Sequence, residues 1–241
     1  LIRAFEGQDA VVCVLGPAGV ALNTVVTQAA HDAGVKRLII NDFGWGPEFR
    51  NLPEFDAIGA TRKVAWRLAA DLASTNTGFT WTGITVGIPI DWALQRFATL
   101  GFDMVNRVAT VYDSGTQEWC GTTRGDIGGA VVRVLLKLDA TANRFVKVRS
   151  IQTSQLAMLD AFQEVTGVDW TVEHATTAGL ISRGRQKLAA GEGGWILDLM
   201  VGQIFEEGAN RGLLPVNDAD LLGLSQISAH DLARLVLSQS T

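Results

Sequence analysis

The feature that most limits what this sequence can fold into is a short apolar run between glycines. Residues 35–40, Val-Lys-Arg-Leu-Ile-Ile, follow Gly34, and the glycines and proline of residues 44–47 end the segment. A run of this length suits a strand that is buried on both faces of a parallel sheet. Ligands of open α/β sheets bind beyond the carboxyl ends of the strands, so the Asn-Asp-Phe of residues 41–43 is expected at the edge that holds the site.

The chain around this run alternates strands and helices. Residues 9–15 and 79–86 are rich in β-branched and aromatic side chains and end at Gly and Pro, which predicts two further strands. Apolar residues at helical spacing predict helices over residues 20–33 and from about residue 56 to 74. We therefore predict that the three strands lie parallel in one sheet with helices on its faces.

The alternation fades after residue 91, which indicates a second, smaller part of the chain. We expect an α/β fold with residues 1–90 in a Rossmann-like domain and residues 91–241 in a mixed α+β annexe that binds substrate. Segments from about residue 126 to 150 are expected to pack back on the sheet. The expected elements are a short helix near Trp92–Leu100, a strand at Val108–Tyr112 with a hairpin turn at Gly115 leading to Trp119, a helix at Ile127–Lys137 capped by Asp126, a strand at Arg144–Arg149, and a helix from Ser154 to Gly167.

Composition excludes several classes of protein. The net charge of −5 and the scattered Lys and Arg residues form no basic stripe, so nucleic acid is not expected as a partner. The two cysteines, Cys13 and Cys120, lack the spacing of a zinc site or a disulfide framework. The uncharged residues 10–30 contain glycines, a proline and polar residues, which favours a strand, a turn and a helix over a membrane span. With no signal-peptide pattern, a cytoplasmic protein with a small-molecule substrate is expected.

One interpretation places a dinucleotide site in the first strand-helix-strand unit. A Gly16-x-x-Gly19 motif follows a strand, and Asp42 lies one strand later. At that position a carboxylate would accept hydrogen bonds from the hydroxyls of a dinucleotide ribose. The fingerprint is incomplete, because Val14 and Leu22 occupy two of its glycine positions and Pro17 removes a backbone N–H donor.

A second interpretation comes from resemblance to a known family. The matching residues, spread over most of the chain, are Gly7–Val12, Ala29–Ala30, Gly34–Arg37, Phe43–Gly44, Lys63, Asp126–Gly128 and Thr166–Gly167. They are similar to the isoflavone-reductase-like, NmrA-like branch of the atypical short-chain dehydrogenases. The resemblance implies that residues 9–15 form the fourth strand, so the phosphate-binding loop and the first βαβαβ portion, about 60 to 70 residues, are expected to be missing at the amino end. The family has Pro-Ser-Glu where this chain has Ile40, Asn41 and Asp42.

The catalytic candidate is Lys63. A Tyr-x-x-x-Lys pair is excluded, because Gly59 lies four residues before Lys63 and Tyr112, the only tyrosine, has Thr116 four residues on. The resemblance implies that Lys63 is the lone general acid or base. The alternative is a surface lysine, because the apolar stripe of that helix leaves Lys63 on the solvent side.

The other site residues are implied mainly by their places at strand ends. Phe43 is expected to flank the nicotinamide or to pack in the core, and Trp45 and Trp92 to line a substrate pocket or to pack. No metal site is expected, since His31, His174 and His230 lack partners at ligand spacing. The expected cofactor contacts are Gly16, Pro17, Asn41, Asp42, Phe43, Lys63, Gly87, Ile88 and Pro89.

The resemblance implies NAD(P)H-dependent reduction, with NADPH as the cofactor, of a small aromatic or carbonyl-containing substrate. Two alternatives stay open: a regulator that senses the dinucleotide and contacts a protein partner, and a fragment that is inactive for want of a phosphate loop. For the latter reason the 241-residue chain is expected to bind NADPH weakly or not at all.

Overall fold

The computed structural model describes residues 1–238, with the side chain of Pro17 left out, and its contacts separate the chain into two compact units. Unit 1 consists of Leu1–Val86, Gly125–Val148 and Val216–Leu224. Unit 2 consists of Gly87–Arg124, Arg149–Pro215 and the residues from Ser225 on. The predicted domain boundary at residue 90 therefore falls within unit 2, close to the end of the first segment of unit 1.

Unit 1 is built on a four-stranded sheet in the order β1-β2-β3-β8. The strands are β1 (Ala10–Val12), β2 (Arg37–Ile40), β3 (Thr80–Thr85) and β8 (Arg144–Lys147). Each neighbouring pair is parallel. The prediction that the first three strands lie parallel in one sheet is confirmed, and β8 joins them beside β3.

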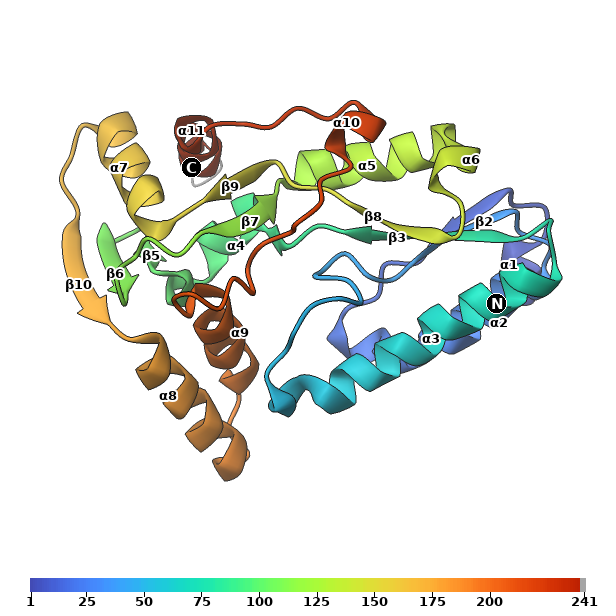
Figure 1. Ribbon diagram of the computed structural model, residues 1–241, viewed down its shortest axis with the longest axis horizontal. Helices are drawn as coiled ribbons and strands as arrows, with labels where there is room; N and C mark the ends of the chain where they lie inside the picture. The colour runs from blue at the N-terminus through green and yellow to red at the C-terminus, as the bar shows by residue number, and fades with distance from the viewer. Residues whose placement is uncertain (239–241) are drawn as a thin grey trace. The chain divides into compact units, whose positions relative to one another are not determined.

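Helices cover both faces of this sheet (Figure 1). Leu38 and Ile40 of β2 point to one face and pack with Trp66 of α3 (Asp56–Thr75) and with residues of α2 (Asn23–Asp32). Ile39 points to the other face and packs with Val134 of α5 (Arg124–Leu136) and with α10 (Ala219–Leu222). Alternate residues of a strand face opposite sides, so a strand covered on both sides buries apolar side chains on both. The exception in β2 is Arg37, which is buried and donates hydrogen bonds to Thr80, Thr82 and Thr141. The other helical segments of unit 1 are α1 (Ile2–Phe5), α6 (Leu138–Thr141) and the 3₁₀ turns Pro17–Leu22 and Pro53–Phe55.

The β8 edge of the sheet is covered by the returning chain. Asp218 accepts hydrogen bonds from the backbone N–H of Lys147 (2.8 Å) and from Arg144 Nη2 (2.8 Å). The backbone N–H of Asp218 donates to the Lys147 carbonyl oxygen at 2.6 Å. A strand edge with unpaired backbone groups can pair with another chain. The hydrogen bonds of Asp218 to Arg144 and Lys147, which we call the clasp, protect the β8 edge from such pairing.

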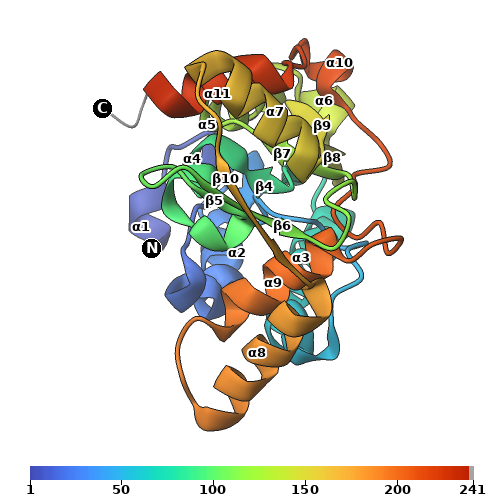
Figure 2. The ribbon, with the colours of Figure 1, turned by 90° about the vertical axis from the view of Figure 1, so that its left-hand side faces the viewer.

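Unit 2 contains two three-stranded sheets, in the orders β10-β6-β5 and β4-β7-β9. The strands are β4 (Ile88–Pro89), β5 (Phe102–Asp103), β6 (Val108–Tyr112), β7 (Trp119–Thr122), β9 (Ile151–Thr153) and β10 (Thr171–Ala175). The helices are α4 (Ile90–Arg96), the 3₁₀ turn Ala98–Leu100, α7 (Gln155–Thr166), α8 (Thr177–Ala190), α9 (Trp195–Phe205) and α11 (Ala229–Ser238). Figure 2 shows β10 running beside β6, and α8 and α9 packing as an antiparallel pair.

Two local predictions for this half of the chain are wrong, and one is confirmed. No hairpin joins β6 to β7, because β6 pairs with β10 and β5, whereas β7 pairs with β4 and β9. Asp126 lies inside the first turn of α5 rather than at its cap; the Asp91 carboxylate accepts from the backbone N–H of Arg124 at 2.9 Å. The predicted helix from Ser154 to Gly167 is correct, with the Ser154 hydroxyl capping its start and Gly167 left-handed at its end.

No helix within residues 1–238 has the length and apolar content needed to cross a bilayer.

Candidate functional site

Asn41 follows β2 directly, and its side chain is fully occupied by contacts inside the protein. Its Nδ2 donates to the Leu15 carbonyl oxygen (3.0 Å) and to Asn23 Oδ1 (3.2 Å). Its Oδ1 accepts from the backbone N–H of Leu15 at 3.3 Å. Asn41 therefore links the segment after β1 to the end of β2, so its amide has a structural role.

Asp42 is buried beside Asn41 in a different setting. Its Oδ2 accepts a hydrogen bond from the Thr85 hydroxyl at 2.8 Å, at the end of β3. Its Oδ1 is buried and has no hydrogen-bond partner within residues 1–238. Burial raises the pKa of Asp42 to about 6, although the Thr85 hydrogen bond, the Arg62 charge and the Gly46 N–H act in the opposite direction.

The segment that leaves Asp42, residues 43–46, is held tightly against β3, and we call it the strap. Phe43 has a φ of 38° and Gly46 a φ of 73°, both in the left-handed region. A Cβ at Gly46 would lie 2.5 Å from Thr85 Oγ1, so only glycine fits there. The backbone N–H of Val86 donates to the Gly44 carbonyl oxygen at 2.8 Å, which fixes the middle of the strap.

Arg62 of α3 lies over the strap and was not predicted as a site residue. Its guanidinium has no hydrogen bond within the described part of the chain, and its Nε is buried. A Cβ built on Gly44 would lie 3.5 Å from Arg62 Nη1, 3.9 Å from Asp42 Oδ1 and 3.4 Å from the Asp42 carbonyl oxygen. These are ordinary van der Waals distances, so a methyl-sized space, the Gly44 recess, is bordered by a cation and a carboxyl.

Lys63 follows Arg62 on α3 and is exposed. No hydrogen bond or ion pair engages its amine within residues 1–238, which leaves the amine available to a ligand. Phe43 packs against the core cluster of Ile39 and Val86, and Trp45 stacks on Phe49 with ring centroids 4.8 Å apart. Unit 1 thus holds aromatic rings on and beside the strap and two cationic side chains, Arg62 and Lys63, on α3.

The turn after β1 does not form a phosphate cradle. Gly16 and Pro17 begin a 3₁₀ turn, and the Gly19 N–H is already bonded to the Gly16 carbonyl oxygen at 2.8 Å. Since proline has no N–H, few free donors point outward from this turn.

The remaining predicted contacts belong to unit 2. Gly87 has a φ of 66°, and Ile88 and Pro89 form β4. Trp92 packs edge-on against Phe97 with centroids 5.1 Å apart. Among residues 1–238, no group of three or more His, Cys, Asp or Glu side chains is placed to hold a metal ion.

Comparison with known proteins gives the chain its family. No family model matches the sequence. Oxidoreductase poxI of Penicillium oxalicum is 50% identical over 241 residues, which covers 98% of this chain and 77% of the relative. The chain belongs to the same family of oxidoreductases as poxI. Oxidoreductase aprR of Aspergillus flavus is 31% identical over 178 residues, which covers 72% of this chain and 58% of that relative.

Solved structures agree on the fold of this isoflavone-reductase-like chain. An isoflavone reductase superposes with a TM-score of 0.75 at 12% identity. The superposition covers 97% of this chain and 76% of the isoflavone reductase chain. A binary complex of leucoanthocyanidin reductase and NADPH from Vitis vinifera gives a TM-score of 0.77 at 13% identity, covering 98% and 82%. The resemblance and the α/β fold predicted from the sequence are confirmed.

Proposed function

We propose that this isoflavone-reductase-like protein reduces a small aromatic or carbonyl-containing substrate with NADPH, and that Lys63 relays the proton. The observation that carries the proposal is the unpaired, exposed amine of Lys63 next to Arg62, whose guanidinium borders Gly44 at the carboxyl end of β2. In an open parallel sheet this is the edge at which ligands bind. Solved structures with a similar fold include a complex of leucoanthocyanidin reductase with NADPH and an NADPH-dependent quinone oxidoreductase, which supports this choice of cofactor.

The residues present fit the nicotinamide half of such a cofactor. The orphaned Oδ1 of Asp42 and the free donors of Arg62 border the Gly44 recess, so polar groups of a ligand have partners there. The turn at Gly16–Gly19 offers no comparable set of donors for a pyrophosphate, and we assign it no phosphate-binding role. Asp42, Arg62 and Lys63 are the residues that would hold the nicotinamide half.

Bound NADPH supplies a hydride, and the chain must supply the matching proton. The Lys63 ammonium donates that proton to the atom of the substrate on which negative charge develops. Because its amine is exposed, water restores the proton after each turnover. Tyr112 takes no part in this step, since its hydroxyl donates to the Thr99 carbonyl oxygen at 3.0 Å and burial raises its pKa.

The aromatic rings of the strap and its neighbours suit an aromatic or conjugated substrate. Phe49 and Trp45 stack with their planes 17° apart, and both side chains are partly exposed. Stacked rings present an apolar face to a planar ligand at little cost in side-chain entropy. We assign substrate packing to this pair.

The test is the turnover of Lys63→Ala in the protein at its complete natural length. Loss of a general acid-base group lowers kcat by roughly 10²- to 10⁴-fold, and kcat/KM falls with it because the interaction is made in the transition state. Arg67→Ala, an exposed cation one turn further along α3, is the matched control and keeps its rate. Near-normal turnover of Lys63→Ala would rule out Lys63 as the proton relay. Absence of turnover in the unaltered protein would favour a dinucleotide-sensing role.

A further inference from the structure

The chain that leaves β2 is held in turn at the ends of three neighbouring strands of the unit 1 sheet. Asp42, after β2, accepts a hydrogen bond from the hydroxyl of Thr85, the last residue of β3, at 2.8 Å. Gly46 lies against the same side chain, since a Cβ built on it would be 2.5 Å from Thr85 Oγ1. Glu48 then forms an ion pair with Lys147, the last residue of β8.

The two partners of this ion pair differ in exposure. The side chain of Lys147 is 13% exposed and that of Glu48 is 69% exposed. The backbone N–H of Lys147 also donates to Asp218 in the clasp at 2.8 Å, so Lys147 is the fixed partner and Glu48 the partner that it positions. Solvent screens this pair less than a pair of two exposed side chains, such as Lys36 and Asp9 at 72% and 83%.

Glu48 lies between the two aromatic residues of the stacked pair. Trp45 and Phe49 stack with ring centroids 4.8 Å apart and planes inclined by 17°. The strap fixes Trp45, because Gly44 accepts a backbone hydrogen bond at 2.8 Å and Gly46 is packed against β3. Phe49 lies beyond the strap and directly follows Glu48. The ion pair of Glu48 therefore controls where the second ring of the stack lies.

We propose that Lys147 is a positioning residue, which holds Phe49 against Trp45 through its ion pair with Glu48 and so keeps the stacked rings in place for a planar substrate. The inference rests on the proposed function, which assigns substrate packing to the two rings, and it names the residue that sets their geometry. Lys147 acts through Glu48 and requires no contact with the substrate. The ligand class that suits such a ring face is a planar, uncharged aromatic carbonyl compound.

The first experiment observes the rings without a ligand. The 241-residue chain is labelled with 5-fluorotryptophan, and the ¹⁹F resonance of Trp45 is identified by its absence in Trp45→Phe. Lys147→Met and Glu48→Gln each remove the ion pair and are expected to move this resonance towards the shift of a solvent-exposed indole. Lys147→Arg keeps the charge and is expected to retain the wild-type shift. Lys36→Met, which removes the exposed pair with Asp9, is the matched control.

The second experiment measures binding of coumarin, a planar and uncharged aromatic lactone. Saturation-transfer NMR gives its affinity for the protein at its complete natural length, with NADP⁺ present so that no reduction occurs. We expect Lys147→Met to weaken binding about fivefold, the value of one net hydrogen-bonded contact, and Lys147→Arg to restore it. On a Phe49→Leu background the ring is already lost, so Lys147→Met is expected to change the affinity by less than about twofold.

Circular dichroism establishes that each variant is folded before it is measured. The inference is overturned if Lys147→Met leaves the Trp45 resonance or the coumarin affinity unchanged, or if the folded wild-type protein binds no coumarin up to about 5 mM. It is also overturned if the full loss persists on the Phe49→Leu background, because Lys147 would then act by another route. The proposed function fails separately: coumarin binding that depends on Lys147, without turnover of any substrate, would reject the reductase and keep the positioning role.

Discussion

Two buried aspartates, one in each unit, show how the same side chain behaves with and without bound cations. Asp198 of α9 receives Arg183 Nε and Nη2 at 3.0 and 2.9 Å and Lys187 Nζ at 2.7 Å, all from α8. Burial raises its pKa, but these hydrogen bonds outweigh burial and the pKa lies below the ordinary value. Burial raises the pKa of Asp42 to about 6, because it outweighs the Thr85 hydroxyl, the Arg62 charge and the Gly46 N–H, which all favour the ionised form. Two cations from α8 stabilise the charge of Asp198, whereas burial disfavours the charge of Asp42.

Removing the paired carboxylate has the largest expected effect. Asp198→Ala leaves two cations without their partner between α8 and α9, which are packed so closely that a Cβ on Gly202 would lie 2.6 Å from Ile181 Cγ1. We expect a loss of about 3 kcal/mol in the free energy of unfolding, at the lower end of the range for a broken buried pair because both cations reach solvent. Urea unfolding at pH 7 measures it, with Asp160→Ala on the exposed face of α7 as the control. A loss no larger than that of the control would contradict this account.

The pH dependence of Asp42 is the next largest effect. Its folded pKa of about 6 lies above the ordinary value of 3.8, so between these values the folded chain holds a proton that the unfolded chain has released. Stability therefore falls as pH rises from about 4 to 6, by about 2 to 3 kcal/mol for a shift of this size. Asp42→Asn removes this dependence. Unfolding of both forms at pH 4 and pH 7 tests it, and parallel curves would show that Asp42 does not titrate in this window.

Thr85→Val sharpens the same comparison with a smaller effect. It deletes the hydroxyl that donates to Asp42 Oδ2 and keeps the volume of the side chain. The hydrogen bond favours the ionised carboxyl, so its loss raises the pKa of Asp42 further and costs about 1 to 2 kcal/mol of stability above that pKa. Carboxyl ¹³C shifts followed through a pH titration give the pKa directly. An unchanged Asp42 titration would refute the role of Thr85.

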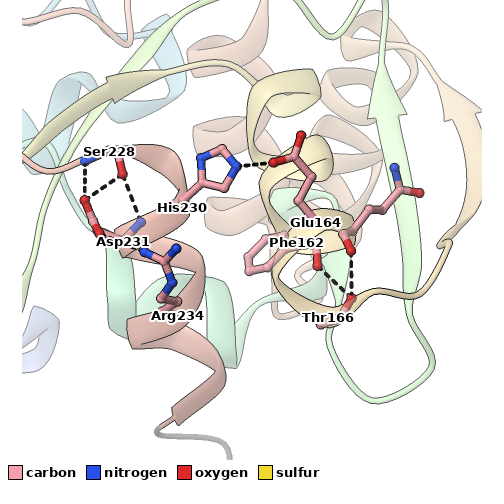
Figure 3. Close-up of polar contacts among 8 residues, drawn as sticks. Phe162, Glu164, Thr166, Ser228, His230, Asp231 and Arg234 are labelled. Atoms are coloured by element: carbon pink, nitrogen blue, oxygen red, sulfur yellow. Dashed lines mark hydrogen bonds and ion pairs between the residues drawn. The ribbon is translucent and has the colours of Figure 1, made fainter.

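The smallest effect is expected where a charge pair is exposed. His230 Nε2 and Glu164 Oε2 lie 2.5 Å apart across α11 and α7, with side chains 42% and 68% exposed (Figure 3). Solvent screens such a pair, so Glu164→Gln should change the unfolding free energy by less than about 0.5 kcal/mol. Ser228→Ala is the contrasting variant, because it breaks the reciprocal cap in which the Ser228 hydroxyl donates to Asp231 Oδ2 (2.6 Å) and accepts from the Asp231 N–H (3.1 Å). It should cost about 1 kcal/mol.

The fold of unit 1 was predictable because its signals are local. The run ending at Ile40 predicted β2, and the helical spacing predicted α3 within a residue or so of Asp56–Thr75. The predicted hairpin at Gly115 is wrong because β6 pairs with β10, which lies far along the chain. A turn glycine does not reveal which strands pair. Register with a distant strand is set by tertiary packing.

The polar residues at the strand end were predicted by position but not by environment. Asn41 and Asp42 are neighbours in sequence and both are buried, yet one amide is saturated by Leu15 and Asn23 while one carboxyl oxygen has no donor. No spacing rule links residue 62 to residue 42, so the position of Arg62 beside the strap could not be predicted from the sequence. The cofactor roles assigned to Gly16, Pro17, Gly87, Ile88 and Pro89, and the pocket roles of Trp45 and Trp92, remain predictions.

The clasp on β8 has a consequence for how the protein is made. Asp218 is synthesised long after the strand edge it covers, and the chain forms most of unit 2 in between. On the ribosome the four parallel strands can assemble while β8 still exposes its backbone N–H and C=O groups. The β8 edge is therefore open to mispairing during this interval, until residues 216–224 cover it.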